Sequence, residues 1–290
     1  MRRLPPRADR ALRGLARRFG YHLVPADYHS PIPEVGALAE EIYERASPLP
    51  GIRLELERQL ALLEGPLAPH LRELGGEGPD GFAVENHAYG PLDAETLYAL
   101  IRERRPARVL ELGSGFSTLV IQRAAAANAR DGAPLEHVVV DPHPPAELVP
   151  VAGRVRLEQV PAQSVPEEQF GWLEAGDVLF VDTTHTVKVG GEVNRVILEV
   201  LPVLPAGVLV HIHDVFLPFE YPRILVEGYR VAWQEQYLVQ AFLSGNHDWA
   251  VLLANHALAR LHAERVAALV PSLRPGVYPC AFWMERVVPG

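Results

Sequence analysis

An acidic residue beside two closely spaced glycines makes the segment around residue 113 the most chemically informative part of the chain. Glu111 ends an apolar run, and a Gly-x-Gly turn of Gly113, Ser114 and Gly115 follows. Because glycine lacks a Cβ and tolerates positive φ, such a turn lets the backbone approach a ligand closely. The first N–H groups of a helix that begins after the turn face the same crevice. The segment therefore predicts a strand, a tight turn and a helix start that bind a nucleotide-like ligand.

Polar residues also end several other apolar runs. Asp141 follows one run, Asp182 follows a second, and the pair His213 and Asp214 ends a third. Doubly wound sheets bind ligands at the carboxyl ends of their parallel strands, near the point where the strand order reverses. We therefore expect these polar residues and the glycine turn to meet at one edge of a sheet. A carboxylate at position 141 is then placed to accept hydrogen bonds from both hydroxyls of a ribose.

The elements that must position these residues alternate regularly from about residue 91 onward. Short apolar strands separated by helices indicate a parallel α/β sheet that is covered on both faces. Two later apolar runs enclose an insertion that carries a helix. The expected strands are 109–112, 138–141, 155–160, 177–182, 208–214, 249–254 and 281–286, and the expected helices include 93–101, 117–127 and 193–204.

The glycine turn departs from the nicotinamide-binding pattern, in which a third glycine would stand at Thr118. The acid two residues before the first glycine instead resembles the first motif of class I S-adenosylmethionine-dependent methyltransferases. The resemblance covers roughly residues 85–255 and is strongest over 106–118 and 177–222. It implies a doubly wound, mostly parallel, seven-stranded Rossmann-like sheet with an antiparallel C-terminal strand pair.

The same resemblance implies a site for S-adenosylmethionine. In that family the acid and the glycine turn hold the methionine end of the cofactor, and the loop after the third strand contacts adenine. The residues that match are Glu111, Gly113, Ser114, Gly115, Asp141, Gln163, Ser164 and Asp182.

The segment that follows the fourth expected strand resembles the acceptor-side loop of small-molecule O-methyltransferases. In enzymes similar to catechol O-methyltransferase, an aspartate at this strand end binds magnesium, and a lysine three residues later deprotonates the acceptor. The aspartate matches Asp182, but the lysine position holds His185. Histidine with a near-neutral pKa suits a general base. Lys188, the only lysine of the chain, is expected to orient an acidic substrate or the cofactor carboxylate.

A divalent metal site is the companion expectation. The metal-dependent relatives end their fifth strand in an Asp-Asn pair, and the matching pair here is His213 and Asp214. With Asp182 they offer oxygen and imidazole ligands, which suit magnesium or manganese and also iron or zinc. A metal-free alternative stays open, in which His185 or His213 is the base and Asp182 or Asp214 orients it.

The sequence thus predicts methyl transfer from S-adenosylmethionine to an oxygen, or less readily a nitrogen, of a small molecule. Two alternatives remain open. One is a metal-dependent hydrolase or oxygenase that uses Asp182, His185, His213 and Asp214. The other is a non-catalytic module that only binds the cofactor.

Bulk composition narrows the class of protein further. The chain has 290 residues and a formal net charge of −9, which argues against nucleic acid as a main partner. Its single cysteine, Cys280, excludes an internal disulfide and fits a reducing compartment. No apolar stretch reaches the roughly 18 residues that a membrane span needs, and no signal peptide is evident. We expect a cytoplasmic protein.

Two domains are expected. Residues 1–80 read as a helical N-terminal cap that could form a homodimer contact, and residues 81–290 read as the methyltransferase domain. The cap begins with a basic amphipathic segment whose apolar stripe comprises Leu4, Leu12, Leu15, Ala16 and Phe19.

Overall fold

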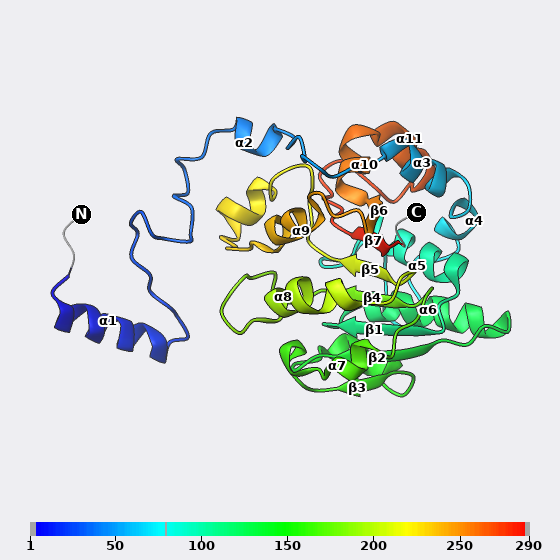
Figure 1. The fold of residues 1–290 in the computed structure, drawn as a ribbon, viewed down its shortest axis with the longest axis horizontal. Coiled ribbons are helices and arrows are strands. Elements are labelled where there is room, and N and C mark those ends of the chain that lie inside the picture. Colours follow the sequence, from blue (N-terminus) through cyan, green and yellow to red (C-terminus); the bar gives the residue numbers. More distant parts are fainter. Residues whose placement is uncertain (1–3, 79, 288–290) are drawn as a thin grey trace.

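A single mixed sheet forms the centre of the computed structural model, which describes residues 4–78 and 80–287 (Figure 1). Its strands are β1 (Arg108–Leu112), β2 (Glu136–Val140), β3 (Arg156–Glu158), β4 (Val178–Val181), β5 (Leu209–Ile212), β6 (Trp249–Ala254) and β7 (Phe282–Arg286). They lie in the order β3-β2-β1-β4-β5-β7-β6. The first five run parallel, whereas β7 is antiparallel to β5 and β6. The predicted doubly wound sheet with an antiparallel C-terminal pair is confirmed.

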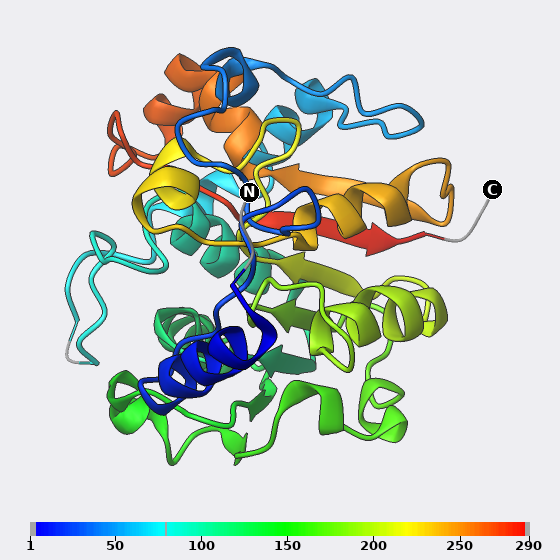
Figure 2. The ribbon, with the colours of Figure 1, turned by 90° about the vertical axis from the view of Figure 1, so that its left-hand side faces the viewer.

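Helices cover both faces of this sheet (Figure 2). The helices of the described residues are α1 (Pro6–Arg18), which lies apart from the sheet, α2 (Glu41–Glu44), α3 (Leu56–Glu64), α4 (Ala68–Leu71), α5 (Asp93–Arg104), α6 (Phe116–Arg130), α7 (Glu167–Phe170), α8 (Glu192–Arg195), α9 (Glu235–Leu243), α10 (Asn255–Leu261) and α11 (Ala263–Leu269). Alternate strand residues point to opposite faces. In β1, Val109 packs into the core under α5 and α6, and Leu110 packs into the core under α8 and α9.

The first 80 residues contain two structurally different parts. Helices α3 and α4 bury Leu60, Leu63 and Leu71 in the same core as Leu97 of α5. Helix α1 has no buried residue, and Figure 1 shows it apart from the sheet at the end of an extended segment. The division of the chain at residue 80 stays a prediction. Within the described ranges, no helix is both long and apolar enough to cross a membrane.

Candidate active site

The glycine turn joins β1 to α6 at the carboxyl end of a central strand, between the ends of β2 and β4. Gly113 has φ +86°, and a Cβ there would lie 1.7 Å from the carbonyl oxygen of Asp182. Its N–H donates to the Val140 carbonyl at 2.9 Å, and the N–H of Asp182 donates to the Leu112 carbonyl at 2.9 Å. Only glycine fits this position, because both the backbone conformation and the close approach exclude a side chain. The turn is therefore fixed by backbone contacts to the ends of β2 and β4.

Next to it, the structure brings together Ser114, Gly115 and Asp141. The Ser114 hydroxyl donates to Asp141 Oδ2, and the N–H of His143 donates to Oδ1 at 2.7 Å. A Cβ added at Gly115 would meet no atom within 4 Å, so open space lies beside the turn. Asp141 is partly exposed at the end of β2. These polar residues border that open space at the start of α6, and we propose below that it is a recess for the donor.

Glu111 is placed differently from its neighbours, since its side chain is completely buried. Its Oε1 accepts a 2.6 Å hydrogen bond from the Ser117 hydroxyl in the first turn of α6. Its Oε2 lies 2.9 Å from Nε2 of His137 on β2. Both oxygens thus face protein groups, and the hydrogen bond from Ser117 ties the first turn of α6 to the Glu111 carboxylate. Direct contact between Glu111 and the cofactor stays a prediction.

The remaining predicted donor-side residues lie farther out on the surface. Gln163 and Ser164 are exposed in a short 3₁₀ turn (Ala162–Ser164) after β3, and the Gln163 carbonyl accepts a 2.5 Å hydrogen bond from Arg195. Lys188 is exposed on the loop between β4 and α8. Among the described residues, none of these three forms a hydrogen bond with the glycine turn, so their roles stay predictions.

His185 is the centre of a buried cluster of charged side chains at the carboxyl ends of β4 and β5. Its Nε2 lies 3.2 Å from Asp182 Oδ1 and 3.2 Å from Asp214 Oδ2, and its Nδ1 lies 2.9 Å from Glu235 Oε2. Burial alone lowers the pKa of this histidine, but the hydrogen bonds that it donates to Asp182 and Glu235 and the charge of Asp214 raise the pKa to about 10. His185 is therefore an imidazolium at neutral pH, and the near-neutral pKa expected from the sequence is not what the cluster produces.

Two backbone distortions accompany this cluster. His185 has φ +55° and Asp214 has φ +56°, in the left-handed region that non-glycine residues seldom adopt. Such conformations cost on the order of 1–3 kcal/mol each and persist where surrounding contacts impose them. The N–H groups of Gln234 and Glu235 donate to the His185 carbonyl, at 3.0 and 3.2 Å, and hold the turn in place.

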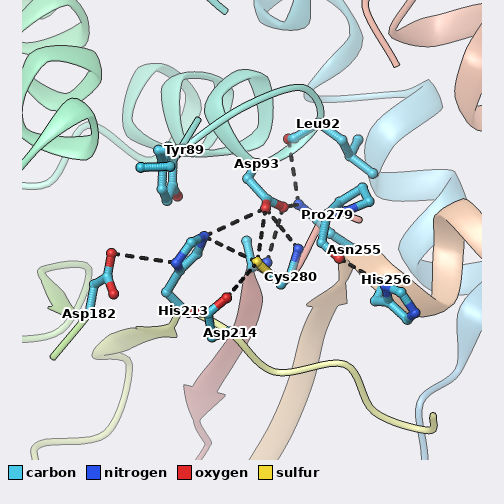
Figure 3. Close-up of polar contacts among 12 residues, drawn as sticks. Tyr89, Leu92, Asp93, Asp182, His213, Asp214, Asn255, His256, Pro279 and Cys280 are labelled. Carbon is cyan, nitrogen blue, oxygen red and sulfur yellow. Dashed lines mark hydrogen bonds and ion pairs between the residues drawn. The ribbon is translucent and has the colours of Figure 1, made fainter. Parts of the chain in front are cut away.

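His213 lies beside this cluster and joins it to a second group (Figure 3). Its Nδ1 is 3.4 Å from Asp182 Oδ2, and its Nε2 is 3.3 Å from Cys280 Sγ. Burial lowers the pKa of His213, but the acidic groups of Cys280, Asp182 and Asp214 raise it well above its usual value. For Asp182, burial raises the pKa, but His213 and His185 lower it below its usual range. Asp182 and Asp214 meet as predicted, with His185 rather than His213 between them.

Three members of the site were not identified from the sequence as site residues: Asp93, Glu235 and Cys280. Asp93 opens α5, and its carboxylate accepts hydrogen bonds from the N–H groups of Cys280 at 2.8 Å and Ala281 at 3.0 Å. Glu235 opens α9. Asp93 and Glu235 are acids at helix starts, which is too common a position to indicate a functional site. Cys280 precedes β7, and its position in the sequence gives no further signal.

A cavity of about 760 Å³ opens beside Asp93 and Cys280. One of its lining residues, His87, makes an edge contact with the ring of Phe116 at 5.4 Å between centroids. Phe116 directly follows the glycine turn, so one wall residue of the cavity packs next to that turn. The wall also includes Leu225, Tyr229 and Tyr278.

Comparison with known proteins agrees with this arrangement. Residues 110–215 match a family model described as a methyltransferase domain, which spans β1 to the end of β5. None of the curated proteins matches the chain significantly. The match assigns a methyltransferase domain to these residues, and the sheet order is the one that the resemblance implies. Both findings support the predicted class I S-adenosylmethionine-dependent methyltransferase and favour it over the hydrolase, oxygenase and binding-module alternatives.

Several solved structures share weak similarity with the chain. The plantazolicin methyltransferase BpumL, in complex with a triazolic desmethylPZN analog and SAH, is 11% identical with a TM-score of 0.38, covering 81% of this chain and 97% of its own. A putative methyltransferase from Thermobifida fusca YX is 14% identical with a TM-score of 0.34, covering 85% and 97%. The CMeT domain of the citrinin polyketide synthase is 14% identical with a TM-score of 0.35, covering 99% and 81%. These similarities are too weak to bear on the substrate.

Proposed function

We propose that this methyltransferase methylates an oxygen atom of a small molecule bound in the cavity beside Asp93 and Cys280. The observation that carries the proposal is the contact between Gly113 and Asp182, which joins the glycine turn to the charge cluster. One half of the edge offers an open recess for the donor, and the other offers charged groups for an acceptor. Asp93 and Cys280 line the cavity, and another lining residue, His87, contacts the ring of Phe116 next to the glycine turn.

The residues of the recess fit S-adenosylmethionine. The open space at Gly115 leaves room for ligand atoms against the backbone, and Asp141 has a partly exposed carboxylate for ribose hydroxyls. Gln163 and Ser164 are proposed at the adenine end, and Lys188 toward a carboxylate. Glu111 is proposed as a positioning residue that acts through Ser117 at the start of α6. The cofactor supplies an activated methyl sulfonium, so the protein mainly aligns the reactants.

On the acceptor side, the charged state of His185 changes the role proposed for it. Methylation forms an O–CH3 bond, breaks the S–CH3 bond and releases the acceptor proton. An imidazolium cannot take that proton, but it stabilises negative charge that develops on the acceptor oxygen. The acceptor proton is released to solvent through the cavity.

A divalent ion such as magnesium or manganese is part of the proposal. Ligand atoms of Asp182, His185 and Asp214 lie within 4.8 Å of one another, and carboxylate oxygens suit such ions. In the metal-bound form the ion would replace the Nε2 proton of His185 while Glu235 holds Nδ1, so the imidazolium role belongs to the metal-free form. His213, predicted as a ligand, would instead contact the outer oxygen of Asp182.

Binding of S-adenosylhomocysteine, measured by titration calorimetry, tests the donor site. A Gly115→Leu variant fills the recess without a backbone penalty, because the residue is extended and its surroundings are open. We expect the variant to lose at least tenfold in affinity with an unchanged melting temperature. Gly153→Leu, at another position where a Cβ meets nothing, is the matched control and should bind normally. Equal affinity in all three proteins would contradict the proposed recess.

Methyl transfer from labelled S-adenosylmethionine to paired hydroxyl and amine compounds tests the acceptor atom. We expect label on oxygen and none on the matched amine. Transfer to the amine alone would contradict O-methylation but not donor binding. We also propose that the protein is cytoplasmic and forms a homodimer. Light scattering of the full chain tests the homodimer.

A further inference from the structure

A second group of potential metal ligands lies behind the charge cluster. Asp93, His213 and Cys280 come from the start of α5, the end of β5 and the segment before β7, and each is buried (Figure 3). Cys280 Sγ lies 3.3 Å from His213 Nε2 and 3.7 Å from Asp93 Oδ2. His213 Nε2 lies 3.7 Å from Asp93 Oδ2. The three donor atoms thus form a compact triangle.

The size of this triangle matches the ligand spacing of a tetrahedral ion. Zinc bonds of about 2.3 Å to sulfur and about 2.0–2.2 Å to nitrogen or oxygen place neighbouring ligand atoms about 3.3–3.7 Å apart. All three observed separations fall in that interval. Thiolate and imidazole ligands also select zinc, cobalt or iron over magnesium. Geometry and chemistry therefore indicate the same class of ion.

The surroundings hold the ligands in the orientation that a metal requires. His213 Nδ1 lies 3.4 Å from Asp182 Oδ2, an outer carboxylate contact that turns Nε2 toward the triangle. The carboxylate of Asp93 is held by the N–H groups of Cys280 and Ala281 and by the Asn255 amide at 2.8 Å. These contacts leave further lone pairs on the Asp93 oxygens for a metal.

We propose that Asp93, His213 and Cys280 bind one zinc-like transition-metal ion whose fourth position faces the acceptor cavity. Asp93 and Cys280 both line that cavity, and three protein ligands with an open fourth position are the pattern of reactive rather than purely structural zinc sites. Binding replaces the Cys280 S–H bond and the His213 Nε2–H bond with bonds to the metal, and both protons are released to solvent. This site differs from the Asp182, His185 and Asp214 group, which has no sulfur, and it does not depend on the proposed O-methylation.

Cobalt substitution of the full-length protein tests the site independently of catalysis. After metal removal with a chelator, Co²⁺ bound to a thiolate gives a sulfur-to-metal charge-transfer absorption in the near ultraviolet. We expect this band to saturate at about one equivalent, to disappear on addition of Zn²⁺ and to resist excess Mg²⁺. Because Cys280 is the only cysteine, the band reports this residue alone.

Two variants and one measurement on the natural chain complete the test. Cys280→Ser should abolish the band, whereas His185→Gln, which changes only the sulfur-free group, should keep it; circular dichroism verifies that both fold. Zinc X-ray absorption of the unaltered protein should show one sulfur neighbour at about 2.3 Å. Absence of both the cobalt band and the sulfur neighbour in folded protein would overturn the proposal and leave Cys280 as a hydrogen-bonded thiol.

Discussion

The donor half and the acceptor half of the sheet edge are built on different principles. At the ends of β1 and β2, backbone conformation and hydroxyl contacts shape an open recess around Ser114, Gly115 and Asp141. At the ends of β4 and β5, buried side chains of opposite charge surround His185 and His213. The donor half therefore depends on backbone shape, and the acceptor half depends on electrostatic balance. Substitutions should affect the two halves in different ways.

The largest effect is expected where the two halves touch. Gly113→Ala would place a Cβ 1.7 Å from the Asp182 carbonyl oxygen, so the ends of β1 and β4 must separate. We expect a loss of about 4 kcal/mol or more in the free energy of unfolding, measured with urea, or no soluble protein at all.

Gly132→Ala is the matched control for that variant. Gly132 has a similar φ of +83°, but a Cβ there meets nothing within 4 Å. It should cost only about 1 kcal/mol, the penalty of the left-handed conformation itself. Equal losses in the two variants would show that conformation rather than the contact with Asp182 is what matters.

On the acceptor side, acid should weaken the cavity wall through His256. This buried ring contacts the Pro279 carbonyl at 3.1 Å, and burial lowers its pKa to about 4. Since the unfolded chain binds this proton near pH 6.5 and the folded protein does not, stability falls as pH drops from about 6.5 to 4. The contribution of His256 approaches about 3 kcal/mol at the lower limit.

Urea unfolding at pH 7 and pH 5 measures this slope. His256→Gln cannot take up the proton and should flatten the dependence, whereas His143→Gln, on an exposed loop, should not. An unchanged slope in His256→Gln would assign the acid sensitivity to other groups.

A smaller loss is expected from the support beneath α6. Ser117→Ala removes the hydrogen bond to Glu111 Oε1 and leaves a buried carboxylate oxygen without that donor. We expect about 1–2 kcal/mol less stability by urea unfolding. Ser164→Ala, at an exposed position, should change stability by less than about 0.5 kcal/mol. If the Ser117 variant is as stable as the natural chain, Glu111 does not hold the helix start.

The smallest change is expected from Asp141→Asn, which keeps the shape of the recess and removes its charge. We expect S-adenosylhomocysteine to bind about tenfold more weakly, a loss of about 1.4 kcal/mol, with the melting temperature nearly unchanged. Glu147→Gln, an exposed acid nearby, serves as the control. Normal affinity of the Asp141 variant would remove this carboxylate from the proposed donor site.

The same contrast explains what could be predicted from the sequence. The sheet was predictable because its strands are short apolar runs, and the glycine turn because its residues are consecutive. The acceptor half combines Asp93, Glu235 and Cys280 with two strand ends, and no local pattern records that they converge. The charged state of His185 also depends on Glu235, 50 residues later in the chain.

One helix shows how a local feature was missed as well. A continuous helix was expected over 193–204, but α8 ends at Arg195 and passes through a π-helical turn at Val196–Val200 into a 3₁₀ turn at Leu201–Val203. Pro202 lacks an N–H group and cannot continue the regular ladder of α-helical hydrogen bonds. The apolar periodicity predicted the position of this segment but not its irregular winding.

The seating of Gly113 against the Asp182 carbonyl has a consequence for how the enzyme can diversify. Main-chain atoms of adjoining strands set the spacing between the two halves, so in the proposed arrangement the axis of methyl transfer is independent of the cavity wall. Under that proposal, Tyr229 and Tyr278 on the wall can be exchanged without moving the axis. The proposed site thus separates the choice of substrate from the geometry of reaction.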